Sequence, residues 1–200
     1  MIGIIDYGSG NVKAISNIYN YLNIENKIIL EKKDFSKVTK LILPGVGAFD
    51  SVMRKINSSG FKNIMNDYII DRKIKILGIC VGMQILASSS EEGNENGLGW
   101  IPGVVKKFKN NKIRLPHMGW NKLIMEKNSL LIKNIDMGSR FYFLHSFYFK
   151  TALLENVVCK TLYDQEFSSI INKDNIFGVQ FHPEKSHDNG IKILKNFALL

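Results

Sequence analysis

Short apolar runs that alternate with helix-like segments constrain the fold of this chain more than any other feature. Four such runs lie in the first half of the chain, at residues 2–6, 27–30, 40–43 and 75–79. The segments between them have helical features, with Asn11 placed to cap a helix over about 11–22 and three-and-four apolar spacing over 61–70. A further helix is predicted over 81–87. Buried strands joined through helices are typical of α/β proteins with a largely parallel sheet.

The pattern changes from about Trp100 onwards. Residues 141–149, 157–163 and 176–181 are rich in aromatic and β-branched residues. We predict that they are strands, several of them antiparallel, that extend the sheet. Asp188 is predicted to cap a closing helix whose apolar face carries Ile191, Leu194, Phe197 and Ala198.

The two halves together predict an α/β fold of three layers. In this fold an open, mostly parallel sheet with some antiparallel strands is flanked by helices. No repeat, low-complexity segment or linker divides the chain. We therefore expect one domain over residues 1–200.

Composition and charge narrow the classes of partner. The chain has 27 basic and 18 acidic residues and a net charge of +9, but its lysines are scattered and form no basic run of five. We therefore expect no nucleic-acid partner, although a basic surface could attract a phosphorylated substrate or an acidic partner subunit. No stretch of about 18 apolar residues predicts a membrane span. The absence of a signal-like start and the presence of only two cysteines favour a cytoplasmic protein.

One of the two cysteines, Cys80, lies in an unusual setting. It is the centre of a G-x-C-x-G sequence, Gly78-Ile79-Cys80-Val81-Gly82, between a predicted strand and a predicted helix. This is the context of a nucleophile elbow, a sharp turn that lifts a reactive side chain above the sheet. The start of the following helix would favour the thiolate. The alternative is a buried cysteine at a tight packing point, which is how we interpret Cys159.

A thiolate nucleophile needs an imidazole and a group that orients it. His182 follows a predicted strand, and Glu184 comes two residues later. The ends of parallel strands meet at one edge of a sheet, so His182 is expected near Cys80. The glycine turn at residues 45–47, also after a strand, offers backbone N–H groups for a developing oxyanion.

Three segments, GICVGMQ, LPGVGAF and QFHPEKS, together resemble the motifs of class I glutamine amidotransferases. The segments DYGSGN, LPHMGWN and YFLHSFY are similar to those of the glutaminase subunits of imidazole glycerol phosphate synthases. The resemblance runs from Asp6 to Ser186, with the motifs in the family's order.

The resemblance implies that Cys80 attacks the side-chain amide of L-glutamine and forms a γ-glutamyl thioester. His182 would protonate the departing ammonia and then activate water, and Glu184 would orient His182. The oxyanion would bind the N–H of Val81 and, after a rearrangement, that of Val46 or Gly47. The residues implied to line the glutamine site are Gly45, Gln84, Glu92, His145, Ser146 and Phe147.

Two of these positions have particular consequences. Glu92 would meet the ammonium group of the substrate. Phe147 stands where the family more often has a tyrosine, so a contact through a hydroxyl group is not expected there, whereas backbone contacts would remain.

The resemblance also implies a partner, a cyclase subunit of (β/α)₈ form that receives ammonia. The positions expected to face it are Asn11, Met118, Trp120, Asn121 and Lys185. No cofactor is implied. No metal is expected either, because a proline and a strand interrupt the spacing of His182, Glu184 and His187.

Two alternatives remain open at this point. One is a related glutaminase that supplies another synthase, such as one for sugar amidination. The other is a catalytically silent regulatory partner that keeps the fold, although Cys80, His182 and Glu184 are all present.

Overall fold

The structure is a computed structural model that describes residues 1–109, 113–136 and 138–200. Within these residues the main sheet has the strand order β2-β1-β3-β4-β13-β12-β11-β8. The first five strands of this order pair in parallel, and the remaining pairs are antiparallel. The bounds are β1 (Ile2–Ile5), β2 (Asn26–Ile29), β3 (Lys40–Gly45), β4 (Lys75–Cys80), β8 (Ile124–Met125), β11 (Val157–Tyr163), β12 (Gln165–Lys173) and β13 (Ile176–Val179).

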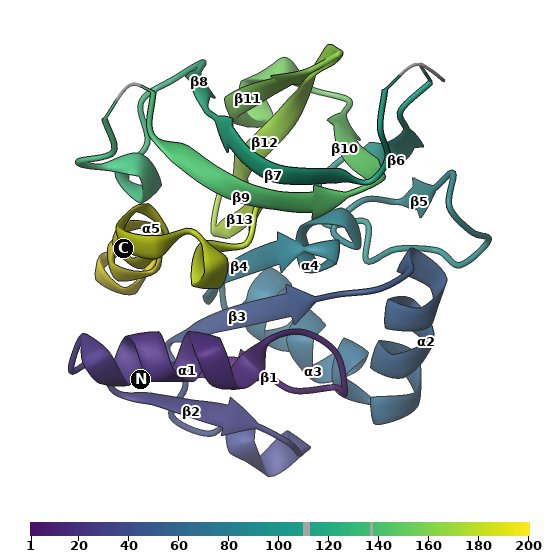
Figure 1. Ribbon diagram of the computed structural model, residues 1–200. Coiled ribbons are helices and arrows are strands. Elements are labelled where there is room, and N and C mark those ends of the chain that lie inside the picture. Colours follow the sequence, from purple (N-terminus) through teal and green to yellow (C-terminus); the bar gives the residue numbers. More distant parts are fainter. Residues whose placement is uncertain (110–112, 137) are drawn as a thin grey trace.

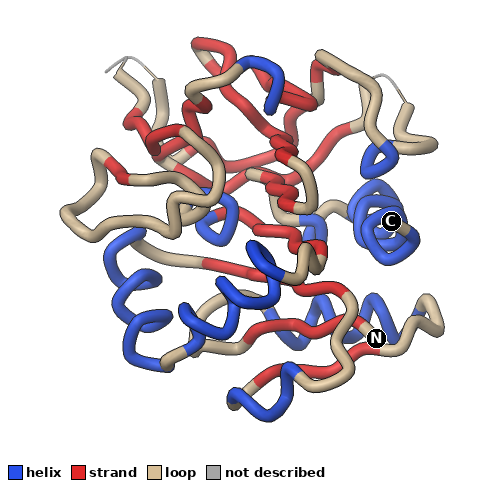
Figure 2. The backbone as a smooth tube through the Cα atoms, turned by 180° about the vertical axis from the view of Figure 1, so that it is seen from behind, coloured by secondary structure: helices blue, strands red, loops and turns tan. Residues whose placement is uncertain are grey.

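Helices cover both faces of the parallel half of the sheet (Figures 1 and 2). On one face α1 (Val12–Tyr21) contacts α5 (His187–Leu199). On the other lie α2 (Phe49–Ser59) and α3 (Phe61–Asn66), which continues as a π-helical turn over Asp67–Asp71. The three-layer α/β prediction is thus confirmed. In the described part of the chain, no helix combines the length and the apolar character that crossing a membrane requires.

Two smaller sheets pack against the antiparallel half. One has the order β10-β6-β5 and the other pairs β7 with β9. Their bounds are β5 (Ser89–Ser90), β6 (Gly103–Lys107), β7 (His117–Lys122), β9 (Arg140–His145) and β10 (Phe147–Thr151). Short 3₁₀ turns cover Lys32–Phe35, Leu130–Ile132, Leu154–Asn156 and Pro183–Lys185.

The apolar runs form the centre of the molecule, as their composition predicts. All four residues of β1 are buried, and α1 buries Val12, Ile15 and Tyr19 from the stripe that faces the sheet. The buried apolar residues belong to one cluster that extends from the parallel strands to Phe141, Phe149 and Phe167. One core therefore supports both halves of the main sheet.

The prediction of one strand over residues 141–149 was wrong. The backbone leaves the strand at Ser146, and β9 and β10 on either side of it belong to different small sheets. These strands pair with β7 and β6, so they do not extend the main sheet as expected. Aromatic residues favour a strand but do not specify its neighbour, because pairing depends on contacts distant in sequence.

Several element ends also differ from the prediction. β3 runs on through Pro44 and Gly45, because its pairing with β1 stops at Ile42 and the missing N–H of Pro44 costs nothing on that side. α4 (Val81–Gln84) is a single turn rather than a helix to residue 87. Asn11 precedes α1 without a capping side-chain hydrogen bond, and Asp188 lies inside the first turn of α5 after Ser186. The 9-residue strand β12 has no counterpart in the prediction, since its mixed sequence QEFSSIINK shows no clear pattern.

Candidate active site

Cys80 occupies a strained turn between β4 and α4. Its φ of 55° and ψ of −113° are rare for a residue with a side chain. Such strain persists where the surroundings enforce it, and it is typical of functional sites. Since α4 has only one turn, its dipole is smaller than the predicted helix would provide.

The glycines of the elbow are required by close backbone contacts. A Cβ on Gly82 would lie 1.9 Å from the Leu43 carbonyl oxygen of β3, and one on Gly78 would lie 2.5 Å from the Gly82 oxygen. Gly45 meets the same turn from β3, where a Cβ would lie 2.5 Å from the Gly82 nitrogen. The elbow thus packs directly on the neighbouring strand, with no room for side chains.

The substitution Gly82→Ala is expected to lower the free energy of unfolding by about 3 kcal/mol, because a backbone atom, which cannot rotate aside, occupies the place of the new methyl group. Urea denaturation measures this. Gly8→Ala is the control, since a Cβ there has no neighbour within 4 Å and only the φ of +82° opposes it. Equal losses in both variants would show that contact with β3 is not the cause.

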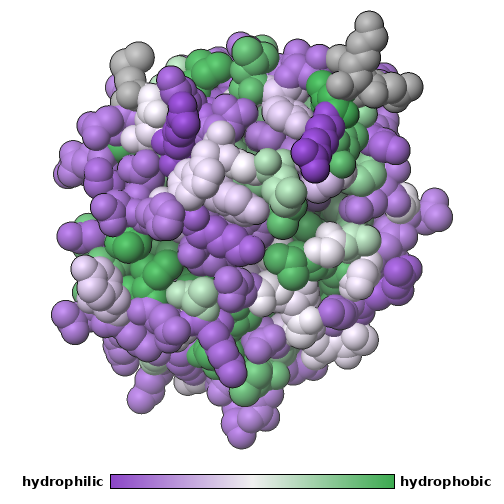
Figure 3. Space-filling model, in the orientation of Figure 1, coloured by the Kyte–Doolittle hydropathy of each residue, from purple (hydrophilic) through white to green (hydrophobic). Residues whose placement is uncertain are grey.

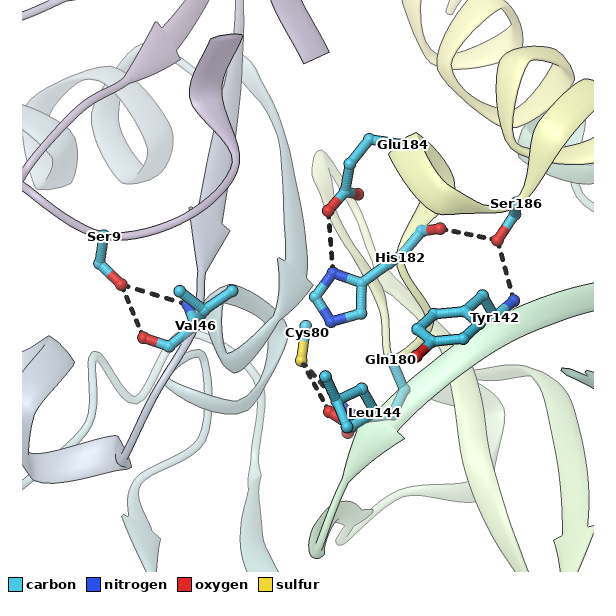
Figure 4. Close-up of polar contacts among 9 residues, drawn as sticks. All are labelled: Ser9, Val46, Cys80, Tyr142, Leu144, Gln180, His182, Glu184 and Ser186. Carbon is cyan, nitrogen blue, oxygen red and sulfur yellow. Dashed lines mark hydrogen bonds and ion pairs between the residues drawn. The ribbon is translucent and has the colours of Figure 1, made fainter. Parts of the chain in front are cut away.

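His182 follows β13, which lies beside β4 in the sheet. Its ring lies beside the Cys80 sulfur, and on its other side Nδ1 is 2.9 Å from Glu184 Oε1 (Figure 4). The side chains of His182 and Glu184 are 4% and 2% exposed. Burial lowers the pKa of His182, but the hydrogen bonds and charges of Cys80 and Glu184 outweigh it and raise this pKa to about 10.

Two further residues, absent from the sequence predictions, hold this arrangement. Ser186 Oγ donates to the His182 carbonyl oxygen at 2.6 Å and accepts from the Tyr142 N–H at 2.9 Å, which fixes the loop that carries the imidazole (Figure 4). Gln180 is fully buried, and its Nε2 lies 3.8 Å from Cys80 Sγ. A lone serine and a lone glutamine carry no sequence signal for these roles.

A cavity of about 270 Å³ opens beside Cys80 and His182. It is smaller than pockets for drug-sized ligands, so it suits a small polar molecule. Ten of the predicted site residues line it, together with the unpredicted Pro116 and Leu144: the ten are Val46, Gly47, Cys80, Val81, Gln84, Glu92, His145, Ser146, Phe147 and His182. Gly45 and Glu184 lie behind this lining.

Glu92 is placed to attract a cation at the cavity wall. Its Oε2 accepts a hydrogen bond from the Phe49 N–H at 2.8 Å, at the first residue of α2. This bond fixes the carboxylate. An anionic group so held can meet the ammonium of an amino-acid ligand.

The second predicted oxyanion donor is engaged elsewhere. The Val46 N–H donates to Ser9 Oγ at 3.2 Å, and Ser9 Oγ donates to the Val46 carbonyl at 2.7 Å (Figure 4). Tyr7 supports the same turn through a hydrogen bond from its hydroxyl to the Pro44 carbonyl. The Val46 N–H must therefore leave Ser9 before it can serve a ligand in the cavity.

Most of the residues predicted to face a partner are exposed. Met118 and Trp120 project from β7 with 59% and 43% exposure, and Trp120 stacks on His187 at 5.0 Å. Lys185 lies over the Tyr142 ring nearby, and Asn11 is exposed after β1. Figure 3 shows hydrophobic and weakly hydrophilic residues gathered near the middle of this face, in the region of β7 and β9.

Asn121 differs from the other four. It lies on the opposite face of β7 from Met118 and Trp120, with Nδ2 3.4 Å from His117 Nε2 and 2.9 Å from the Leu162 carbonyl oxygen. Alternation along a strand explains this, because residues 118 and 120 share one face and 121 the other. Its amide therefore serves the interior.

Relatives with the same organisation are known. The family Glutamine amidotransferase class-I matches residues 3–200. The imidazole glycerol phosphate synthase subunit HisH of Leptospira interrogans is 48% identical over 204 residues and covers all of both chains. HisH 2 of Methanococcus maripaludis is 47% identical over 198 residues and 98% of each chain.

Solved structures agree on the fold. A crystal structure of a glutamine amidotransferase has a TM-score of 0.77 at 20% identity, over 100% of this chain and 99% of the other. A putative GMP synthase component from Thermoplasma acidophilum has a TM-score of 0.74 at 21% identity, over 98% and 91%. With the family match and the full-length relatives, these results show that the chain belongs to the class I glutamine amidotransferase family.

Proposed function

We propose that this chain is the glutaminase subunit of an imidazole glycerol phosphate synthase in histidine biosynthesis. It hydrolyses L-glutamine to L-glutamate and ammonia and passes the ammonia to a cyclase subunit. The observation that carries this proposal is the arrangement of Cys80, His182 and Glu184 at neighbouring strand ends beside a small cavity. The names of the full-length relatives favour this synthase over others.

The chemistry follows from the positions of the groups. Cys80 Sγ attacks the amide carbon, and the tetrahedral oxyanion accepts the N–H of Val81 at the start of α4. His182 protonates the leaving ammonia, and a γ-glutamyl thioester remains on Cys80. His182 then takes a proton from water, which attacks the thioester and releases glutamate. Glu184 keeps the ring oriented throughout.

The partner in this proposal is a cyclase of (β/α)₈ form, bound as a heterodimer in the cytoplasm. Ammonia must stay uncharged and shielded from water if it is to act as a nucleophile, which explains a partner that covers the site. The exposed apolar residues Met118 and Trp120 on β7 support a docking surface on this side.

The bond between Val46 and Ser9 explains how such a partner could control the rate. In the free chain the second oxyanion donor is occupied, and one such donor is worth about 10²–10³ in kcat. Partner binding that turns the residue 45–47 backbone would complete the oxyanion hole. The free chain is therefore expected to hydrolyse glutamine slowly.

The substitution Ser9→Ala is expected to raise the rate of the free chain about tenfold, because it removes both hydrogen bonds that hold Val46 away from the cavity. Glutamate release without the cyclase measures this. Ser16→Ala is the matched control, since this serine also bonds across to a neighbouring segment, at Asn26. A Ser9→Ala rate at or below that of the wild type would show that Ser9 does not restrain the turn.

The proposal itself is tested by glutamate release from glutamine, measured with the chain alone and then with the cyclase and its phosphorylated ribulosyl substrate. A low rate that rises steeply with partner and substrate supports the proposal. Activity that ignores this cyclase would assign the chain to another synthase. No activity under any condition would favour a silent regulatory partner.

A further inference from the structure

Two buried histidines beside the cavity have no part in the chemistry proposed above. His117 on β7 and His145 on β9 are directly opposite in the strand register and are 3% and 6% exposed. His117 Nδ1 lies 3.1 Å from His145 Nε2. His145 lines the glutamine cavity, whereas His117 lies behind it.

The hydrogen-bond partners determine which nitrogen carries each proton. His145 Nδ1 is 2.8 Å from the Phe147 carbonyl oxygen, and because a carbonyl only accepts, Nδ1 carries the hydrogen. Burial above all lowers the pKa of His145 to about 3, aided by the charge of His117, and burial lowers that of His117 to about 4. Both rings are therefore neutral at pH 7, and each has a single N–H.

The direction of the whole chain of hydrogen bonds follows. Since His145 Nε2 has no hydrogen, it accepts one from His117 Nδ1–H. His117 Nε2 is then an acceptor too, and the Asn121 amide 3.4 Å away donates to it. The same Asn121 nitrogen donates to the Leu162 carbonyl of β11 at 2.9 Å, which anchors the chain of bonds in the main sheet.

At its other end this chain of bonds reaches the cavity wall. The Phe147 carbonyl accepts from His145 and also from Gln84 Nε2 at 2.9 Å, so both of its lone pairs have donors. Gln84 Nε2 donates in turn to Gln180 Oε1 at 3.0 Å, and Gln180 Nε2 lies 3.8 Å from Cys80 Sγ. The backbone at Phe147, where the polypeptide leaves β9 for β10, is thereby fixed relative to the nucleophile.

Aromatic packing holds the His117 ring in this geometry. It stacks on Tyr163 with ring centroids 3.9 Å apart and planes at 16°, and on Phe143 at 4.9 Å and 17°. A ring held on two sides keeps its Nδ1 directed at His145.

We propose that His117 is a positioning residue for glutamine hydrolysis: by donating to His145, it fixes the tautomer of His145 that holds the Phe147 carbonyl at the wall of the glutamine cavity. This inference rests on the proposed glutaminase function and extends it to a residue that does not touch the substrate.

Two variants of His117 separate its hydrogen bond from its packing. His117→Phe keeps an aromatic ring between Tyr163 and Phe143 but removes the donor. It is expected to raise the KM for glutamine about tenfold, with a smaller change in kcat, in the complex with the cyclase. His117→Asn keeps an N–H near the position of Nδ1 and is expected to recover most of the loss. Tyr163→Phe is the matched control, because it keeps the stacked ring and loses only the bond to the Arg114 carbonyl.

Ring ¹⁵N chemical shifts test the tautomers directly in the wild-type chain. We expect both rings to be neutral with the hydrogen on Nδ1 from pH 6 to pH 8. In His117→Phe, His145 is expected to show a mixture of tautomers. An imidazolium, or an Nε2–H tautomer of His145 in the wild type, would overturn the proposal.

Glutamine affinity separates this inference from the proposed function. Calorimetry in a Cys80→Ala background requires neither turnover nor a cyclase. There His117→Phe is expected to raise the Kd about tenfold. Unchanged Kd and KM in a folded His117→Phe variant would overturn the positioning role, even if the wild type proves to be the proposed glutaminase. A raised Kd together with an inactive wild type would refute the proposed function alone.

Discussion

Cys80→Ala is expected to abolish glutamate release, with a loss of at least about 10⁴-fold, because no other group in the cavity can form the thioester. The fold should survive, since the turn needs no sulfur and alanine also removes the bulk that opposes a positive φ. Binding of the cyclase should survive as well, because Cys80 is 3% exposed and lies inside the cavity. Glutamate assays, thermal unfolding and calorimetry with the cyclase measure these three properties.

Cys159→Ala is the matched control. This second cysteine lies in β11 and is 1% exposed, and burial raises the pKa of its thiol to about 12. It is therefore expected to remain a thiol at neutral pH and to contribute only packing. Iodoacetamide should label Cys80 and spare Cys159 in the folded chain. Full activity in Cys80→Ala, or lost cyclase binding in a folded variant, would contradict the roles assigned here.

The parallel half of the sheet could be predicted from the sequence because its determinants are local. Strands β1 to β4 are short apolar runs, and each is readable from its own residues. The elbow is equally local, since Gly78 and Gly82 flank Cys80 and mark the close approach to β3. Placing His182 needed only the rule that parallel strand ends meet at one edge.

The rest depended on contacts between distant parts of the chain. Ser9 meets Val46 across 37 residues, and Ser186 meets Tyr142 across 44. The break at Ser146 arises because β9 and β10 find different neighbours, β7 and β6, and no pattern within 141–149 encodes that choice. The inward face of β7 was hidden for the same reason, since His117 and Asn121 acquire their roles only against His145 and Leu162.

His182→Asn is expected to lower glutamate release by about 10²–10⁴-fold, because asparagine can neither protonate ammonia nor deprotonate water. It should also change the pH dependence of stability. The pKa of His182 is 6.5 in an ordinary setting and about 10 in the folded chain, so the imidazolium is favoured by folding. This contribution is fully present below pH 6.5 and is lost as the pH rises towards 10.

The wild type should therefore exceed His182→Asn in stability most at pH 6, and the difference should shrink steadily up to pH 10. Urea denaturation across this range measures it, and a difference that does not vary with pH would contradict the raised pKa. Glu184→Gln provides the comparison, because it removes one of the charges that raise this pKa. In that variant the loss should be complete at a lower pH. A pH dependence that moves with Glu184 would show that the carboxylate favours the imidazolium form and does more than hold the ring in place.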